Sequence, residues 1–225
     1  MTPAAPALAA YLEVGTRRVF ACAVDWPGWC RSGKTEDLAL EALGAYAPRY
    51  ARVADLAGVP FPATAASRFT VVERVPGNAT TDFGAPGAVP EGDAQPVTAE
   101  EADRLAALLR ASWAVFDTVV EGAPAELRKG PRGGGRDRDK IVDHVLGAEV
   151  GYARQIGLRH RQPQREDAAA VQALRLAILE VLGMASTGAP LAPKGWPARY
   201  AARRIAWHAL DHAWEIEDRS DPAPV

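Results

Sequence analysis

Residues 206–215 read Ala-Trp-His-Ala-Leu-Asp-His-Ala-Trp-Glu and hold two of the four histidines of the chain, His208 and His212. On a helix, side chains four residues apart project from one face, one turn apart. The same face carries apolar residues, namely Ala201, Ile205, Ala209 and Ile216. The pattern predicts a helix that turns both imidazoles toward a core, which is a usual way for a helix to present two nitrogens to one metal ion.

Two interpretations of this histidine pair stay open at this point. Buried histidines are often held by a carboxylate or a carbonyl group, because an unpaired buried polar group costs about 1–3 kcal/mol. A metal ion would satisfy the same nitrogens, but it needs a third ligand. The metal interpretation therefore depends on what the rest of the chain supplies.

The composition predicts a soluble, cytoplasmic protein whose partner is a small molecule. The 225 residues are 48% hydrophobic, which is enough for one large domain or two small ones. The net charge of −2 gives no attraction to nucleic acid, and neither a signal peptide nor an apolar run of about 18 residues is present. Two cysteines, Cys22 and Cys30, do not make a disulfide framework, so we expect free thiols.

Residues 1–76 are predicted to form a small β/α module. Aromatic and β-branched residues on either side of Gly15 indicate two strands of a hairpin. Thr35 is a good N-cap for a helix, since two acidic residues follow it. The expected elements are strands at 11–14, 18–24 and 68–75, an irregular turn at 25–35 and a helix at 35–50.

Residues 28–35 match G-x-x-x-x-G-K-T, the pattern of a phosphate-binding loop. In that interpretation Lys34 binds the β- and γ-phosphates and Thr35 binds magnesium. In the alternative, Gly28 and Gly33 are turn residues, while Lys34 is a solvated charge and Thr35 is a cap. The sequence lacks the further βαβ units that a nucleotide-binding domain of this type needs. Nucleotide binding through 28–35 is therefore the lesser alternative.

The segment from Tyr11 to Leu43 also resembles the HicB antitoxin-type domain, in which two strands precede P-G-C-x-x-x-G-x-T and an acidic, alanine-rich helix. The residues that match are Pro27, Gly28, Gly33, Thr35 and Glu36. Cys30 lies one place later than the cysteine of the pattern. The resemblance implies a module used for binding or assembly, and it assigns no catalytic residue.

Residues 77–97 are rich in glycine and proline and are predicted to be a linker. The segment is long for a passive loop, so it could equally run over a neighbouring surface or beside a site. After it, a capping-box pattern at Thr98–Glu101 opens the first of four amphipathic helices. These helices are expected at 98–121, 137–157, 166–184 and 198–219. The expected fold is an α+β protein in which residues 98–225 form an up-down four-helix bundle.

The second and fourth of these helices bring three histidines within reach of one another. His144 lies at the edge of the inward face expected for the second helix, and His208 and His212 lie on the fourth. Bundle cores host metal sites built from facing helices. His160 follows an arginine at a helix end and is expected to be solvated.

Residues 98–219 resemble the DinB-like (YfiT-like) family of metal-binding bundles. The family has one histidine near the start of its second helix, in a context like Asp143–Glu149, and H-x-x-x-H on the fourth. The resemblance implies that His144, His208 and His212 bind a divalent metal ion, zinc or nickel. It also implies an enzyme that activates a low-molecular-weight thiol.

The hypothesis from the sequence is a metal-dependent enzyme, either a thiol-dependent transferase or isomerase or a hydrolase. Three protein nitrogens leave an open position on a tetrahedral ion, which is a feature of catalytic sites. Glu215, three residues after His212, and Asp211 are the candidate catalytic or supporting carboxylates. The alternative is a non-catalytic binding or regulatory protein with a structural or vestigial metal site. In that case the helical half is a scaffold for stability or for homodimer formation.

Overall fold

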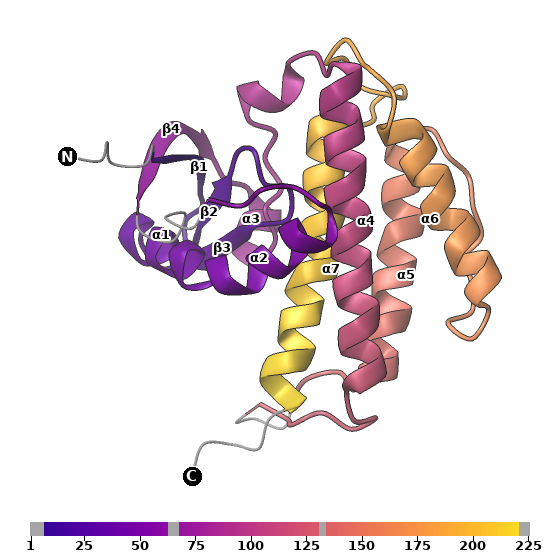
Figure 1. Ribbon diagram of the computed structural model, residues 1–225. Coiled ribbons are helices and arrows are strands. Elements are labelled where there is room, and N and C mark those ends of the chain that lie inside the picture. The colour runs from indigo at the N-terminus through magenta and orange to yellow at the C-terminus, as the bar shows by residue number, and fades with distance from the viewer. Residues whose placement is uncertain (1–6, 63–67, 131–133, 221–225) are drawn as a thin grey trace.

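The computed structural model describes residues 7–62, 68–130 and 134–220, and it has an α+β layout (Figure 1). A four-stranded sheet with short helices occupies the N-terminal part, and long helices follow it. The Pro- and Gly-rich sequence at 131–135 predicts a break between the first two long helices, and residues 131–133 of it lie outside the described residues. Among the described helices, none combines the length and the apolar composition needed to cross a membrane.

The sheet has the strand order β3-β2-β1-β4. Its strands are β1 (Leu8–Val14), β2 (Val19–Ala23), β3 (Cys30–Gly33) and β4 (Phe69–Pro76). β1 and β2 form the predicted antiparallel hairpin, which is closed by a 2.9 Å hydrogen bond from the backbone N–H of Gly15 to the carbonyl of Arg18. β4 pairs with β1 in parallel, so the chain between the hairpin and β4 has to cross over the sheet.

The segment expected to be an irregular turn contains the edge strand β3. β3 pairs antiparallel with β2, and the register places Cys30 opposite Cys22 with their Cα atoms 4.1 Å apart. A disulfide joins the two residues, so the expectation of free thiols is wrong for this structure. Directly opposed residues of neighbouring strands project to the same face of a sheet. The sequence did not reveal this proximity, because it did not reveal β3.

The helix predicted from Thr35 to about Tyr50 is two helices, α1 (Glu36–Ala45) and α2 (Ala47–Leu56). Thr35 caps α1 as predicted, since its hydroxyl accepts a 3.3 Å hydrogen bond from the backbone N–H of Leu38. The second helix begins anew because Pro48 lies in its first turn, where the missing amide hydrogen is tolerated.

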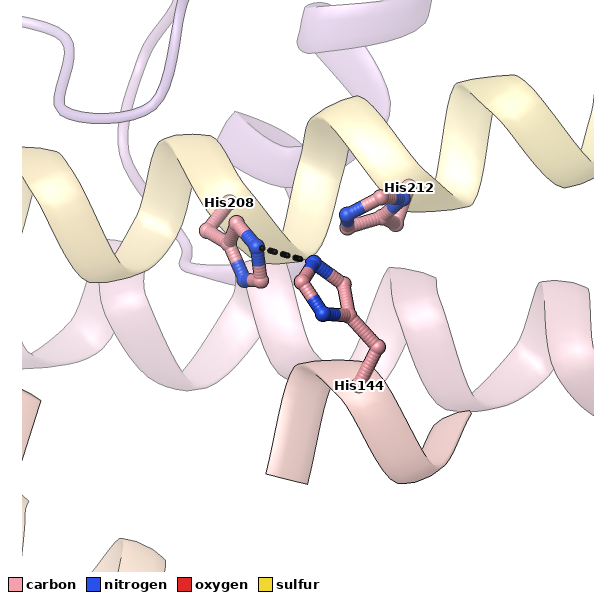
Figure 2. A group of neighbouring side chains, drawn as sticks. All are labelled: His144, His208 and His212. Atoms are coloured by element: carbon pink, nitrogen blue, oxygen red, sulfur yellow. Dashed lines mark hydrogen bonds between the residues drawn. The ribbon is translucent and has the colours of Figure 1, made fainter. Parts of the chain in front are cut away.

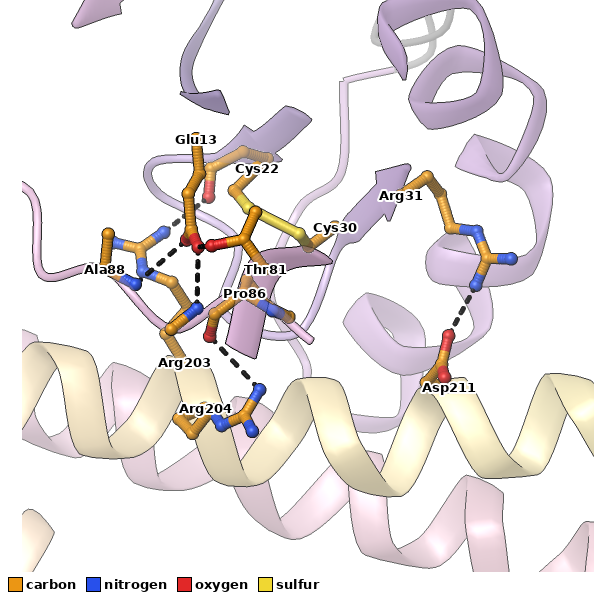
Figure 3. Close-up of a disulfide and its surroundings, with 12 residues drawn as sticks. Glu13, Cys22, Cys30, Arg31, Thr81, Pro86, Ala88, Arg203, Arg204 and Asp211 are labelled. Atoms are coloured by element: carbon orange, nitrogen blue, oxygen red, sulfur yellow. Dashed lines mark hydrogen bonds and ion pairs between the residues drawn. A yellow bond between two sulfur atoms is a disulfide. The ribbon is translucent and has the colours of Figure 1, made fainter. Parts of the chain in front are cut away.

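The segment predicted to be a linker, residues 77–97, is anchored to β1 by a buried carboxylate. Glu13 is fully buried and accepts hydrogen bonds from Gly87 N at 2.9 Å, from Ala88 N at 3.0 Å and from the hydroxyl of Thr81 (Figure 3). The segment therefore lies against the sheet, and it contains α3 (Ala79–Phe83) and the 3-10 turn η1 (Glu91–Ala94).

Four long helices follow, and each begins and ends within a few residues of its expected bounds. They are α4 (Ala99–Gly122), α5 (Arg138–Gln155), α6 (Ala168–Leu182) and α7 (Ala198–Ser220). The capping box that opens α4 is present, with Thr98 and Glu101 each accepting a hydrogen bond from the other's backbone N–H. α7 packs against α4 and α5, and α6 lies on the side away from the sheet (Figure 1).

The N-terminal part and the long helices share one continuous apolar core. The backbone of Gly28 approaches α7 so closely that a Cβ there would lie 2.8 Å from Leu210 Cδ1 and 3.0 Å from the backbone of Ala206. Gly28 also has a φ of +90°, which side chains disfavour. A glycine is therefore required at this contact with α7, independently of any phosphate.

Candidate metal centre

Three histidines from two helices converge in the structure (Figure 2). His144 projects from α5 toward His208 and His212 on α7, and one ring nitrogen from each lies within 4.8 Å of the others. The Nε2 atoms of His144 and His208 are 3.2 Å apart. Two ligands about 2.05 Å from a tetrahedral zinc ion are about 3.3 Å apart. One edge of the cluster already has the spacing of a zinc site, and the third nitrogen would need to approach by up to about 1.5 Å.

The two helices place these side chains through their apolar faces. α7 is buried along most of its length, and His208 and His212 are only 6% and 9% exposed. His144 is half-buried, because it lies beside rather than within the buried stripe of α5. The i, i+4 spacing on α7 and the contact between α5 and α7 therefore create the cluster.

Burial and mutual proximity keep the imidazoles of His144 and His208 neutral. Burial lowers the pKa of His208 well below its usual range, and the neighbouring His212 and His144 lower it further. Burial also lowers the pKa of His144, with the same contribution from His212. The neutral imidazole is the form that binds metal ions. His144 and His208 therefore offer unprotonated nitrogens to a metal ion at neutral pH.

Metal-free protein should lose stability as the pH falls below about 6.5. The folded-state pKa values of His144 and His208 lie below the unfolded value, so the unfolded chain takes up these protons first. The stabilisation is complete at higher pH and is lost as the pH falls from the unfolded toward the folded pKa. Urea midpoints measured at pH of about 7.5 and 5.5 test this, with His208→Gln expected to show the smaller pH dependence. An equal dependence in both proteins would contradict it.

Glu215 fixes the orientation of one member of the cluster. Its Oε2 lies 2.8 Å from His212 Nδ1, and its Oε1 accepts a 2.6 Å bond from Arg219. The hydrogen bond with His212 lowers the pKa of Glu215, which is therefore ionised and accepts only. His212 Nδ1 must then be the donor, so Nε2 is the nitrogen that remains to bind a metal ion. A carboxylate that holds the second nitrogen of a histidine is typical of metal sites.

Glu215→Gln should weaken zinc binding by about 10–100-fold, as the loss of a carboxylate behind a ligating histidine does elsewhere. The amide can no longer hold the His212 tautomer through a charged acceptor. Competition against a chromophoric chelator measures the affinity. Glu217→Gln is the matched control, because Glu217 lies on the same helix and pairs with Arg52 instead of an imidazole. Equal zinc affinities of the two variants would show that Glu215 does not support the metal site.

Two other carboxylates near the histidines on α5 and α7, those of Asp211 and Glu149, pair with arginines and form no hydrogen bond to an imidazole among the described residues. Asp211 bonds to Arg31 of β3 at 2.9 Å rather than to a histidine ring. Glu149 of α5 faces a neighbouring helix and pairs with Arg175 of α6 at 3.4 Å. No hydrogen-bond partner of the buried His208 Nδ1 is found in the described part of the chain. His212 is thus the only histidine of the cluster with a described carboxylate partner.

Two further side chains, Tyr152 and Arg204, border the histidine cluster. The sequence by itself did not place them at the site. The ring of Tyr152 meets His208 edge-on, with centroids 5.6 Å apart. Arg204 lies over the rings of Tyr152 and Trp207 and donates a 3.1 Å hydrogen bond to the carbonyl of Pro86. Tyr152 is two turns beyond His144 on α5, and Arg204 is one turn before His208 on α7. Helical spacing was therefore the signal that could have joined them to the site.

Residues 28–35, which match the phosphate-loop pattern, do not form a phosphate-binding loop in the structure. Residues 30–33 are strand β3, and the hydroxyl of Thr35 caps α1. A Cβ at Gly33 would lie 2.4 Å from the backbone nitrogen of Ala39, so close packing against α1 explains this glycine. Lys34 is exposed. The geometry favours the alternative of a solvated charge at Lys34 and a cap at Thr35, but Gly33 belongs to strand β3 and is not the turn residue that was expected.

One cavity in the helical half does not contain the three histidines. It measures about 600 Å³ and lies between α4, α5 and α6, with Trp113, Leu146 and Leu179 among its lining residues. A smaller cleft of about 280 Å³ lies between β3 and α7 and includes Glu215. Since Glu215 bonds to His212, the smaller cleft borders a residue that contacts the histidine cluster.

No family model, curated protein or solved structure matches this chain.

Proposed function

We propose that the chain is a metal-dependent enzyme of the DinB-like class, built on an up-down four-helix bundle of α4 to α7. The observation that carries this proposal is the convergence of three histidine nitrogens from α5 and α7 within 4.8 Å. The placement of one histidine on the second long helix and two on the fourth agrees with the family pattern. In the described part of the chain, no cysteine, aspartate or glutamate joins the group as a fourth ligand.

A donor set of three imidazoles suits zinc or nickel, and it leaves a coordination position for a water molecule or a substrate. A divalent ion held there would supply Lewis-acid activation of a bound water or low-molecular-weight thiol. The residues of the chain have separate tasks. His144, His208 and His212 hold the ion, and Glu215 fixes the tautomer of His212. Glu215 is also an ionised carboxylate beside the cluster that could take a proton from a bound group.

Metal uptake and thiol binding test the proposal together. Protein purified without a metal-binding tag should contain, or take up, about one zinc or nickel ion per chain. The cobalt-substituted protein should then develop a thiolate-to-cobalt absorption band when a small thiol is added. Turnover of thiol-transfer and ester substrates should follow metal content. His160→Ala should behave like the natural chain, because His160 does not belong to the cluster.

The outcomes separate the proposal from its alternatives. Failure of the natural chain to take up zinc, nickel or cobalt would overturn the metal-enzyme proposal. Metal uptake without turnover on thiol or ester substrates would favour a non-catalytic protein with a structural metal site.

A further inference from the structure

The cleft between β3 and α7 is lined mainly by polar and charged side chains. Its volume is about 280 Å³, below the usual range for pockets that hold drug-sized ligands. One wall is the β2–β3 edge, with Cys30 of the disulfide in it, and the opposite wall is α7 (Figure 3). The charged residues that line it are Arg18, Arg31, Asp211, Glu215 and Asp218.

Four of these five charges are already paired. Arg31 and Asp211 pair across the cleft at 2.9 Å, as Figure 3 shows. Glu215 pairs with Arg219 and His212, and Asp218 pairs with Arg49. The carboxylates of the cleft are thus neutralised by cations that belong to the fold.

Arg18 is the exception. Its guanidinium has one hydrogen bond, a weak one of 3.4 Å to the hydroxyl of Ser32, and no carboxylate partner among the described residues. Arg18 is half-buried, and Ser32 also lines the cleft. A guanidinium presents a planar fork of N–H donors that fits the two oxygens of a carboxylate or phosphate group. The charged group of the cleft that remains available to a ligand is therefore the guanidinium of Arg18.

Glu215 connects this cleft to the metal cluster, because it lines the cleft and bonds to His212 Nδ1 at 2.8 Å. We propose that the cleft binds the substrate of the metal site, a small molecule whose carboxylate or phosphate group is held by Arg18 and Ser32. The role as a substrate site rests on the proposed metal-dependent function. The anion site itself rests only on Arg18, Ser32 and the paired charges around them.

Anion binding to metal-free protein tests the site without involving the metal. Inorganic phosphate and acetate are each titrated into ¹⁵N-labelled protein, and the backbone resonances of Arg18, Arg31 and Ser32 are followed. We expect saturable shifts at these residues, and the stronger of the two anions identifies the preferred group. Arg18→Gln should weaken binding at least about tenfold, which is the effect of one charge-assisted hydrogen bond of 1.4 kcal/mol or more. Ser32→Ala should weaken it less.

Arg17→Gln is the matched control, since Arg17 is the exposed neighbour of Arg18 and donates a hydrogen bond to Asp82 through its backbone N–H. It should bind both anions like the natural chain. Absence of shifts in the cleft, or equal affinity of Arg18→Gln and Arg17→Gln, would overturn the site. Metal content measured on the same samples keeps the two proposals apart. Loss of zinc uptake with Arg18-dependent anion binding retained would refute the metal enzyme and the substrate role, but would support the anion site.

Discussion

Replacing His208 with alanine should weaken zinc binding by more than about 100-fold, because the loss of a direct ligand exceeds the 10–100-fold effect of losing a supporting residue. His208 is 6% exposed, and its Nε2 lies 3.2 Å from Nε2 of His144. Its removal leaves two nitrogens, too few to hold a zinc ion against water. Elemental analysis and competition against a chelator measure the loss.

Two control variants distinguish the loss of a metal ligand from a folding defect. His208→Gln keeps much of the side-chain volume and should lose zinc to a similar degree while retaining the helical circular-dichroism spectrum. His160→Ala removes the histidine that lies outside the cluster and should bind zinc like the natural chain. If His208→Gln kept full zinc affinity, the cluster would be a set of hydrogen-bonded core histidines instead of a metal site.

Asp93→Ala should lower the free energy of unfolding by about 3–5 kcal/mol, the usual cost of stranding one partner of a buried ion pair. Asp93 of η1 is 1% exposed, and its carboxylate forms a two-point ion pair with Arg203 of α7. Arg203 also donates a 2.9 Å hydrogen bond to the carbonyl of Ala23 at the end of β2. The variant leaves the Arg203 charge buried without its counter-charge. Urea denaturation followed by tryptophan fluorescence measures the change.

A double variant distinguishes a stranded charge from lost packing. Asp93→Leu combined with Arg203→Met removes both charges, so it should be markedly more stable than Asp93→Leu alone. Asp103→Ala, at an exposed position of α4, should change stability by less than about 0.5 kcal/mol. A double variant as unstable as the single one would show that the ion pair is not the source of the effect.

The elements that could be predicted are those whose signals lie within one stretch of chain. The capping box at Thr98 and Glu101, the apolar stripes of the long helices and the turn at Gly15 are all local patterns. They gave helix bounds within a few residues and the β1–β2 hairpin. The i, i+4 spacing of His208 and His212 is equally local, and the apolar stripe of the second long helix placed His144 at the edge of its inward face. The structure brings these three residues together.

The elements that were missed depend on partners far along the chain. β3 is a strand because it pairs with β2, although its own sequence has turn residues on both sides. Its register with β2 also decides the disulfide. The Gly- and Pro-rich segment lies against the sheet because Glu13, more than seventy residues earlier, accepts hydrogen bonds from Gly87 and Ala88. None of these partners leaves a periodic signal in the segment itself.

By itself, the sequence determined the α+β layout, the long helices and the histidines that a metal would use. Hydrophobic periodicity and capping act over one or two turns, so they can be read along the chain. Only the tertiary structure decided which charges remain available. Arg31 meets Asp211 across 180 residues and Arg203 meets Asp93 across 110, while Arg18 is left facing a cleft without a carboxylate among the described residues. Pairing of charges depends on distance in space, and that distance is set by the packing of β3 and η1 against α7.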